Sequence, residues 1–449
     1  MTTTSPDRVG QSRRRGPPRV GFFGLLGRGN LGNDGSLDAV VLYLRKQHPD
    51  AQLGFMGSCP ADLSARYGAP ASRLRWYYSD LMAPRGVIGA AIRTLGASVG
   101  LGVDAVRIAR WVRRYDIVIV PGMGVLEASL PLRAWHTPYS LFVLSAVGRI
   151  FRTKVALISV GAGIINGRAM RWLITGAARH AYYRSFRDTT SRDAMQAMGL
   201  RVVVNDPVYP DLAFWLPTPP DNTGKPGTVG VGVMDYSGGN DDRAQASEIH
   251  AAYVNMMKQF VRWLVDSGRP VRLLVGDVDD EPVVREILAD LRASRPDADP
   301  GQVVYEPAAS LDDVMRQMAS VDTVVAMRFH NVVCSLRMGK PTLAIGYARK
   351  HDALMAQLGV PEFSEQVKSV DLARLIERFT ELEGRAAHVR QVLTVQAAVQ
   401  RQLLDDQFAR LSALLLPGAV SRGVPAPRGA TSSVERRSVP AAMEGESYE

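Results

Sequence analysis

Short apolar runs rich in β-branched residues recur along this chain, each followed by a glycine turn or polar cluster and then by helical spacing. Residues 321–326 and 342–346 are two such runs. Each suits a strand that is buried on both faces. Between them, residues 331–338 place apolar side chains at helical spacing, and Gly339 with Pro341 ends that helix. Repeated strand, turn and helix units with buried strands predict a parallel, doubly wound α/β sheet.

These units form two series, separated by a polar segment rich in proline and glycine. The first series covers residues 19–218, and the second covers residues 228–417 and ends in closing helices. The segment between them is typical of an interdomain linker. The basic stretch 1–18, and the stretch 418–449 with its low apolar content, are expected to be disordered tails. The chain therefore predicts two Rossmann-like doubly wound domains, in a GT-B-like arrangement with a cleft between them.

Basic residues outnumber acidic ones, which bears on the partners of the chain. Its 449 residues carry a formal net charge of +10, and the pI is about 9.7. Three of these charges lie in residues 1–18 and none in residues 419–449, which leaves seven for the folded body. That surplus fits an anionic substrate or an anionic membrane surface. Nucleic acid is not expected, because the basic residues are not interleaved with aromatic residues on one stripe.

Cysteine and histidine usage predicts no metal site. Cys59 and Cys334 are too few and too far apart for a disulfide framework or a metal cluster, and no group of Cys, His and Asp has metal-ligand spacing. Residues 1–18 lack the apolar stretch of a secretory signal. We therefore expect no metal and a cytoplasmic protein.

Cationic side chains follow two neighbouring buried strands. Arg328 and His330 come after the first, and Arg349 and Lys350 come after the second. Open α/β sheets bind ligands outside the carboxyl ends of their strands, so these four side chains are expected in one crevice that holds an anion. If the chain stays extended here, Arg328 and His330 point to the same side. The competing interpretation is that such arginines and lysines face solvent and that the histidine is structural.

A glycine-rich turn, residues 25–35, follows the first strand and precedes a helix. This order is typical of a cradle for a nucleotide or a phosphate, in which backbone N–H groups and the helix N-terminus face the ligand. The spacing Gly27-x-Gly29-x-x-Gly32 fits a dinucleotide fingerprint, although that pattern alone is weak. Asp34 has a second interpretation as a helix cap.

Residues 84–114 are apolar and glycine-bearing, with arginines interspersed. Arg93 and Asp104 interrupt the apolar run, which argues against a membrane-spanning helix. One interpretation is a basic amphipathic helix that lies on an anionic bilayer, which would place the protein peripherally at the inner face of the membrane. The other is a covered surface helix of the first domain.

A series of short motifs runs through residues 19–365. They lie at residues 29–32, 121–124, 159–163, 185–191, 210–214, 328–330, 339–341 and 347–350. In this order and spacing they resemble the motifs of the polysaccharide pyruvyl transferase family. Each motif is weak alone, and the series is specific.

The resemblance implies a transferase that takes pyruvate from phosphoenolpyruvate and places it as a ketal on a sugar of a polysaccharide or glycolipid. It implies that Arg187, Arg328 and Lys350 bind the donor, since cations clamp its carboxylate and phosphate. It assigns catalysis to His330 and Arg328, because an imidazole that titrates near neutrality suits protonation of the methylene carbon. Phosphoenolpyruvate is then a co-substrate, and neither a cofactor nor a metal is required.

The resemblance also implies that the first domain holds the acceptor, with Asn30, Asp34 and Gly124 as binding residues. Two departures from the family pattern lie in this domain. Family members commonly have Gly-Asp-Glu after the first loop, where this chain has Gly-Asn-Asp at residues 32–34. They tend to have three consecutive glycines where this chain has Pro-Gly-Met-Gly at residues 121–124. These departures concern the identity of the acceptor more than the reaction.

Two other functions compete with this one. A GT-B glycosyltransferase using a nucleotide sugar would want an acidic residue for the ribose and a base-stacking loop in the second domain, and the sequence offers no convincing pair. A non-catalytic, membrane-bound assembly factor is the third hypothesis. The joint presence of Arg187, Arg328 and His330 argues against it.

Overall fold

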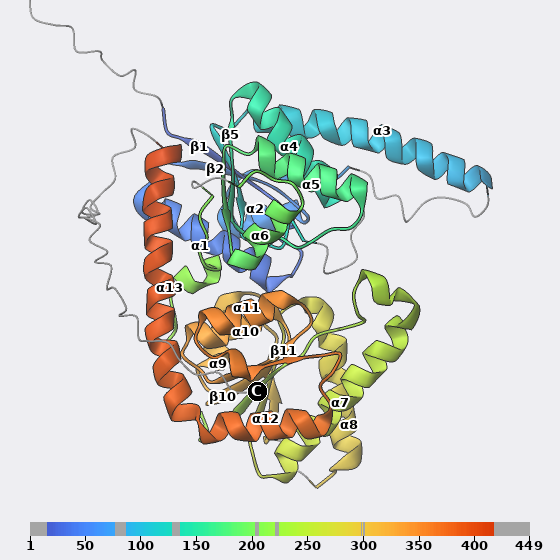
Figure 1. Cartoon of the computed structure of the whole chain (residues 1–449), viewed down its shortest axis with the longest axis vertical. Helices are drawn as coiled ribbons and strands as arrows, with labels where there is room; N and C mark the ends of the chain where they lie inside the picture. The colour runs from blue at the N-terminus through green and yellow to red at the C-terminus, as the bar shows by residue number, and fades with distance from the viewer. Residues whose placement is uncertain are drawn as a thin grey trace, which may run out of the picture.

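The protein folds into two α/β domains, each built on a six-stranded sheet in which every strand pair is parallel (Figure 1). The computed structural model describes residues 16–76, 87–127, 135–202, 206–220, 224–297, 299 and 301–416. The predicted tails at 1–18 and 418–449 lie outside these residues, apart from residues 16–18.

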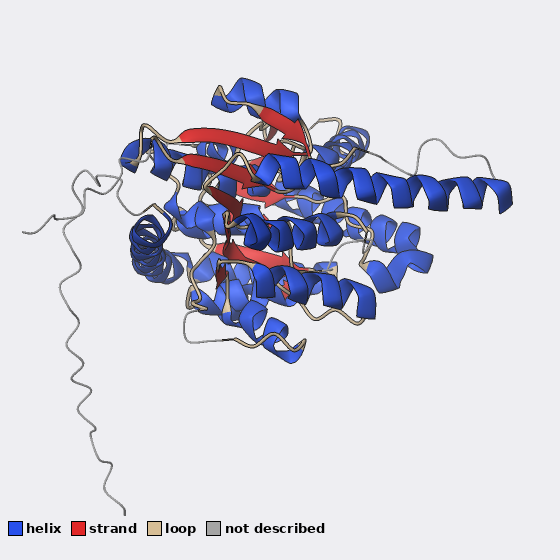
Figure 2. Cartoon of the chain, turned by 90° about the horizontal axis from the view of Figure 1, so that it is seen from above, coloured by secondary structure: helices blue, strands red, loops and turns tan. Residues whose placement is uncertain are grey.

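The N-terminal sheet has the strand order β3-β2-β1-β4-β5-β6. Its strands are β1 (Arg19–Phe23), β2 (Gln52–Gly57), β3 (Ala71–Arg73), β4 (Ile117–Pro121), β5 (Lys154–Val160) and β6 (Tyr183–Phe186). The helices are α1 (Leu31–Gln47), α2 (Pro60–Tyr67), α3 (Val87–Val112), α4 (Thr137–Phe151), α5 (Arg168–His180) and α6 (Thr189–Ala197). Helices α3, α4 and α5 lie side by side on one face of the sheet (Figures 1 and 2).

The C-terminal sheet has the strand order β12-β11-β10-β7-β8-β9. Its strands are β7 (Val229–Gly232), β8 (Val271–Leu274), β9 (Val303–Tyr305), β10 (Thr323–Ala326), β11 (Thr342–Gly346) and β12 (Ser364–Gln366). The α-helices of this half are α7 (Ala246–Asp266), α8 (Glu281–Ser294), α9 (Leu311–Met318), α10 (Phe329–Arg337), α11 (Arg349–Gln357) and α12 (Leu372–Gly384). Short 3-10 helices are η1 (Leu212–Trp215), η2 (Asn240–Gln245), η3 (Val278–Asp280) and η4 (Pro361–Phe363).

The apolar runs of the sequence are the central strands of these sheets. Every residue of β4, β10 and β11 is buried, which matches strands covered by helices on both faces. In both sheets the strand order reverses beside the first strand of the domain, as in doubly wound folds. The prediction of two Rossmann-like domains is confirmed.

The two domains touch directly where their strands end. The glycine turn after β1 meets the turn after β8 through two backbone hydrogen bonds, in which Leu31 N–H donates to the Gly276 carbonyl at 3.2 Å and Val278 N–H donates to the Gly29 carbonyl at 3.4 Å. Gly29 has a φ of 87°, and a Cβ there would lie 2.8 Å from the Val278 side chain. Glycine is therefore required for this close approach. The sequence predicted that the glycine turn after β1 faces a phosphate. In the structure this turn contacts the second domain.

The last helix, α13 (Ala386–Leu415), joins the two domains. Its middle contacts the C-terminal domain through a hydrogen bond of 2.7 Å between Gln357 and Gln400. Its end lies on the N-terminal domain, where Lys154 donates to the Leu414 carbonyl. The sequence placed all closing helices in the second domain. Helical spacing shows that a helix has an apolar face but not which domain covers it, and α13 is covered by both (Figure 1).

Phe408 anchors α13 to the N-terminal domain. The side chain is buried, stacks on Tyr43 at 4.6 Å and meets Trp215 edge-on at 5.2 Å. We expect Phe408→Ala to lower the free energy of unfolding by about 3–5 kcal/mol, because a buried aromatic ring is replaced by a cavity. Urea unfolding measures the change. Val399→Ala, at an exposed position of the same helix, is the control and should change stability by less than about 0.5 kcal/mol. Equal losses in both variants would contradict this packing.

Helix α3 contains most of the segment 84–114, of which residues 84–86 lie outside the described part. Its C-terminal end is tied to the domain, since Ile108 and Trp111 are buried and the Asp104 carboxylate accepts from Arg107 at 2.8 Å and from the Trp76 N–H at 2.9 Å. Among the described residues, no helix combines the length and hydropathy needed to cross a bilayer. The covered-helix interpretation thus holds for the last turns of α3, and contact with a membrane stays a prediction.

Candidate functional site

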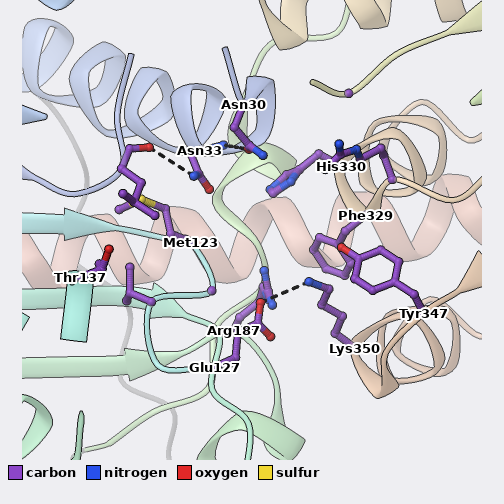
Figure 3. A pocket seen from close by; sticks show the side chains of 15 residues that line it. Asn30, Asn33, Met123, Glu127, Thr137, Arg187, Phe329, His330, Tyr347 and Lys350 are labelled. Atoms are coloured by element: carbon purple, nitrogen blue, oxygen red, sulfur yellow. Dashed lines mark hydrogen bonds and ion pairs between the residues drawn. The ribbon is translucent and has the colours of Figure 1, made fainter. Parts of the chain in front are cut away.

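A cavity of about 160 Å³ lies between the domains at the carboxyl ends of the strands (Figure 3). Both domains contribute side chains to its wall. The lining residues are Leu25, Asn30, Asn33, Met123, Gly124, Val125, Glu127, Thr137 and Arg187 from the first domain, and Gly276, Arg328, Phe329, His330, Tyr347 and Lys350 from the second. Arg328, His330 and Lys350, three of the four side chains that the sequence predicted to share a crevice, are among them, and so is Arg187, which the family resemblance assigned to the donor.

Arg187 follows the end of β6 and reaches into the cavity. The side chain is buried, with its guanidinium 4.4 Å from the centre of the Phe329 ring. The nearest carboxylate oxygens are Asp211 Oδ2, 3.6 Å from Nη1, and Asp188 Oδ2, 3.7 Å from Nε. Nε and Nη2 have no hydrogen-bond partner among the described residues. A buried cation with unused N–H groups beside a cavity is a strong candidate to bind an anion.

Room for this guanidinium comes from a glycine. A Cβ at Gly161 would lie 2.4 Å from Nη2 of Arg187, so a side chain at this turn after β5 would displace the guanidinium. Gly124 has the same relation to Glu127, since a Cβ there would lie 1.8 Å from the carboxylate. The two glycine turns seen in the sequence thus make space for one cation and one anion in the cavity wall.

Lys350 and Glu127 form an ion pair across the cleft, with 3.2 Å between Nζ and Oε1 (Figure 3). Burial alone would lower the pKa of Lys350, but the Glu127 carboxylate outweighs it and raises the pKa. Burial alone would raise the pKa of Glu127, but Lys350 and Arg187 lower it. Both groups are therefore charged. Nζ also lies 5.4 Å from the centre of the Phe329 ring and 4.9 Å from that of Tyr347.

His330 faces the first domain. Its Nε2 lies 3.5 Å from Oδ2 of Asp211, which is an ion pair when the ring is protonated. Burial would raise the pKa of Asp211, but His330, Arg187 and the Ala213 N–H lower it to about 2. A Cβ at Gly32 would lie 1.9 Å from Nδ1 of His330, so this glycine of α1 lets the ring approach. The ring is held between an ionised carboxylate and a backbone surface.

A second histidine, His351, lies behind the cavity wall and does not line it. It is fully buried against the Phe329 and Tyr347 rings, and Nε2 is 3.0 Å from the Met327 carbonyl. Burial lowers its pKa to about 3, and the charge of Lys350 acts in the same direction. His351 is therefore neutral near pH 7 and supports the aromatic rings.

Arg328 differs from the expected picture. Helix α10 begins at Phe329, so the chain is not extended through His330. Arg328 donates to Asp280 through Nε at 2.8 Å and Nη2 at 2.5 Å, and Nη1 lies 4.0 Å from Asp277. Its guanidinium lines the cavity but is largely engaged by carboxylates. The extended geometry expected for residues 328–330 was wrong, although both side chains line the cavity.

The three expected acceptor residues have different surroundings. Asn30 lines the cavity, caps α1 and donates to Asp277 across the cleft at 2.9 Å. Gly124 also lines it. Asp34 does not, because its buried carboxylate accepts from the Gly27 N–H at 2.7 Å. Arg349, expected in the crevice, is exposed at the start of α11 and lies outside the cavity wall.

Burial of Asp34 predicts a pH effect on stability. Burial raises its pKa from 3.8 to about 6, against the opposing Gly27 N–H. Between pH 3.8 and about pH 6 the Asp34 carboxyl is protonated in the folded protein but ionised in the unfolded chain. The contribution of the protonated carboxyl to stability is therefore full below pH 3.8 and is lost as the pH rises through about 6. Asp34→Asn should reduce that loss and be more stable than the parent at pH 7, by up to about 3 kcal/mol.

Urea unfolding of both proteins between pH 4 and pH 7 measures the difference. Asp62→Asn, an exposed position in α2, is the control and should follow the parent at every pH. If the stability of Asp34→Asn has the same pH dependence as that of the parent, burial of the Asp34 carboxyl does not destabilise the folded protein at pH 7.

Sequence reasoning missed Glu127 and Asp211 as parts of the site. Asp211 stands in a motif that the sequence singled out, so a signal was available, but nothing in it indicated a histidine partner. Glu127 follows Gly124 by three residues and belongs to no motif. Among the described residues, no group of His, Cys, Asp and Glu side chains is arranged to hold a metal ion. The expectation of a metal-free reaction stays a prediction.

Two parallel six-stranded domains with a cleft at their strand ends define a GT-B-like enzyme architecture. Solved structures of this kind are similar to the chain over most of its length. UDP-GlcNAc 2-epimerase from Neisseria meningitidis bound to UDP-GlcNAc has a TM-score of 0.52 and 12% identity, over 88% of this chain and 100% of the other. S. aureus MnaA with UDP has a TM-score of 0.55 and 9% identity, over 89% of this chain and 97% of the other. Anabaena Alr3699/HepE in complex with UDP has a TM-score of 0.50 and 13% identity, over 88% of this chain and 100% of the other.

At these identities the likeness shows the fold. The sequence identifies the family more specifically, because the sequence model of the polysaccharide pyruvyl transferase family matches residues 30–349. The chain belongs to the polysaccharide pyruvyl transferase family. A search of the curated proteins finds no match.

Proposed function

We propose that this protein transfers pyruvate from phosphoenolpyruvate to a sugar of a polysaccharide or glycolipid of the cell envelope, as a cyclic ketal. Membership of the family supports a transferase of this kind. The observation that carries the choice of donor is Arg187, which lines the cavity with a buried guanidinium whose Nε and Nη2 have no hydrogen-bond partner in the described part of the chain. Phosphoenolpyruvate carries a carboxylate and a phosphate, and planar guanidinium groups bind such oxyanions through paired hydrogen bonds.

The cavity wall matches the other parts of this donor. Lys350, which is paired with Glu127, places a second cation in the wall, and Arg328, which is paired with Asp280, places a third. The rings of Phe329 and Tyr347 give the wall apolar surface that suits the vinyl group. Donor binding by Arg187, Lys350 and Arg328 thus combines charge with an apolar contact.

The chemistry that follows needs one acid. His330 donates a proton to the methylene carbon of the donor, and the adjacent carbon becomes oxocarbenium-like. A sugar hydroxyl adds to that carbon, the bond to the phosphate oxygen breaks, and a second hydroxyl closes the ketal. Of the two hydroxyl protons, one restores the proton given by His330 and the other leaves with phosphate. The products are a pyruvate ketal and inorganic phosphate.

The two departures from the family pattern bear on the acceptor. Asn33 and Met123 both line the cavity, on the side of the first domain. Met123 has a φ of 63°, an uncommon conformation for a residue other than glycine. Differences at these positions change the wall where the acceptor sugar would lie. We therefore assign acceptor binding to this side, with Asn30 and Gly124 among its residues and Asp34 in a supporting place.

A glycosyltransferase using a nucleotide sugar is the alternative. It would want a carboxylate in the second domain that is available to ribose hydroxyls. Asp280 is fully buried and accepts from Arg328 and from the backbone N–H groups of Asp235, Gly276 and Asp277. Asp277 accepts from Asn30. Neither carboxylate is available without breaking these contacts, which supports phosphoenolpyruvate as the donor.

Ligand-dependent thermal stability separates the two donors. Phosphoenolpyruvate should raise the melting temperature in a concentration-dependent way, since a ligand that binds the folded state stabilises it. UDP-GlcNAc and UDP should have little effect at the same concentrations, and inorganic phosphate should act more weakly than phosphoenolpyruvate. Stabilisation by UDP-GlcNAc alone would favour the glycosyltransferase.

A further inference from the structure

One face of the N-terminal domain is almost free of negative charge. It is formed by helices α3, α4 and α5, with α4 packed between the other two (Figures 1 and 2). These helices contain no glutamate and one aspartate, Asp104, which is buried and paired with Arg107. We call the outer surface of these helices, with the turns that follow α3 and α4, the basic face.

Exposed arginines cover the basic face. They are Arg110, Arg114, Arg149, Arg152, Arg168 and Arg179. Within the described part of the chain none of them forms an ion pair. By contrast, Arg285 pairs with Glu281 and Arg316 pairs with Asp312 within helices of the second domain. The basic face therefore carries several positive charges that no carboxylate of the described residues neutralises.

Large apolar side chains lie among these arginines. Ile150 is 72% exposed, Trp172 is 61% exposed and Val106 is 48% exposed. Phe151 is also exposed and lies under the Arg113 guanidinium at 5.0 Å. Aromatic and branched side chains with arginines around them are the composition of surfaces that enter the headgroup region of a bilayer.

We propose that the basic face docks on the surface of a bilayer that contains anionic phospholipid. The arginines attract the headgroups, and Ile150, Phe151 and Trp172 insert between them. Charge complementarity selects the anionic bilayer, because a protein partner would have to supply carboxylates against every arginine. The proposal extends the contact expected for residues 84–114 to all three helices and does not depend on the donor of the reaction.

Flotation of the full-length protein with vesicles tests the proposal. The vesicles are phosphatidylcholine alone, or phosphatidylcholine mixed with phosphatidylglycerol. The parent protein should float only with the mixed vesicles, and added salt should release it. Combined Arg149→Glu, Arg152→Glu and Arg179→Glu should weaken binding at least about 100-fold, since each arginine near an anionic surface accounts for roughly a five-fold change.

A second variant tests insertion without changing charge. Ile150→Ser with Trp172→Ser should weaken binding by about 10-fold or more. The matched control is Arg285→Glu, Arg292→Glu and Arg316→Glu, which makes the same charge change at exposed positions of the second domain and should bind nearly as the parent does. Circular dichroism and thermal unfolding confirm that each variant is folded, and either variant alone is a sufficient test.

Three results would overturn the proposal. One is a parent protein that floats equally with neutral vesicles or with none. Another is unchanged binding in the charge variant or in the serine variant. The third is a parent protein that is a dimer in solution and becomes a monomer when Trp172 and Ile150 are replaced, because a second copy would then cover the face.

Discussion

Replacing Arg187 with alanine should weaken phosphoenolpyruvate binding at least about 100-fold, as measured by titration calorimetry. Arg187 lines the cavity, and its Nε and Nη2 have no hydrogen-bond partner among the described residues. Each charge-assisted hydrogen bond to the donor contributes about 1.5 kcal/mol or more. Arg187→Lys keeps the charge but loses the paired geometry, so it should restore binding only in part.

Arg184→Ala is the control for this variant. Arg184 lies on β6, the strand that Arg187 follows. It is paired with Asp206 at 2.7 Å and does not line the cavity. Its loss should leave donor affinity unchanged. Donor affinity that survives in Arg187→Ala would show that the donor is held elsewhere. Arg328→Ala is a less direct test, because it leaves the fully buried Asp280 carboxylate unpaired and should cost about 3–5 kcal/mol of stability.

His330→Ala should lower turnover by roughly 10²–10⁴-fold, the usual effect of removing a general acid, while donor affinity changes far less. The ring lines the cavity and is positioned by Asp211, whereas the neighbouring His351 is neutral and outside the wall. Phosphate release from phosphoenolpyruvate, in the presence of a cell-envelope glycan fraction as acceptor, measures turnover.

His330→Gln separates the two roles that the ring could have. Glutamine keeps a hydrogen-bond donor but cannot deliver a proton, so this variant should be as slow as the alanine variant. Near-normal turnover in His330→Gln would leave His330 as an anchor of the donor and would move the acid to another group.

The fold could be predicted largely because its strands are short and buried on both faces. Residues 323–326 and 342–346 contain no charged residue, and threonine is their only polar residue, which favours central strands of a parallel sheet. The glycine turns then place the strand ends at one edge. For the same reason Arg328, His330 and Lys350 could be assigned to one crevice, since they follow the ends of neighbouring strands, although Arg349 was assigned there too and lies outside it. Arg187 was assigned through the family resemblance.

What could not be predicted depends on how the two domains face each other. The Glu127–Lys350 and Asp211–His330 contacts each join residues from different domains, so no local pattern reports them. A helix begins at Phe329 where an extended chain was expected, and local spacing did not reveal it. Local spacing also did not reveal that both domains cover α13. Asp34 looked available beside a helix N-terminus because its hydrogen bond to Gly27 is a tertiary feature of the turn.

The central claim is that phosphoenolpyruvate is the donor, and isotope transfer tests it most directly. The full-length protein is incubated with carbon-13-labelled phosphoenolpyruvate and a glycan or glycolipid fraction of the cell envelope, and the product is examined by mass spectrometry and NMR. We predict a glycan that carries the labelled pyruvate carbons as a cyclic ketal, with phosphate released in equal amount and neither product formed by Arg187→Ala. A glycan that stays unlabelled, but gains a sugar when UDP-GlcNAc is supplied, would contradict the claim.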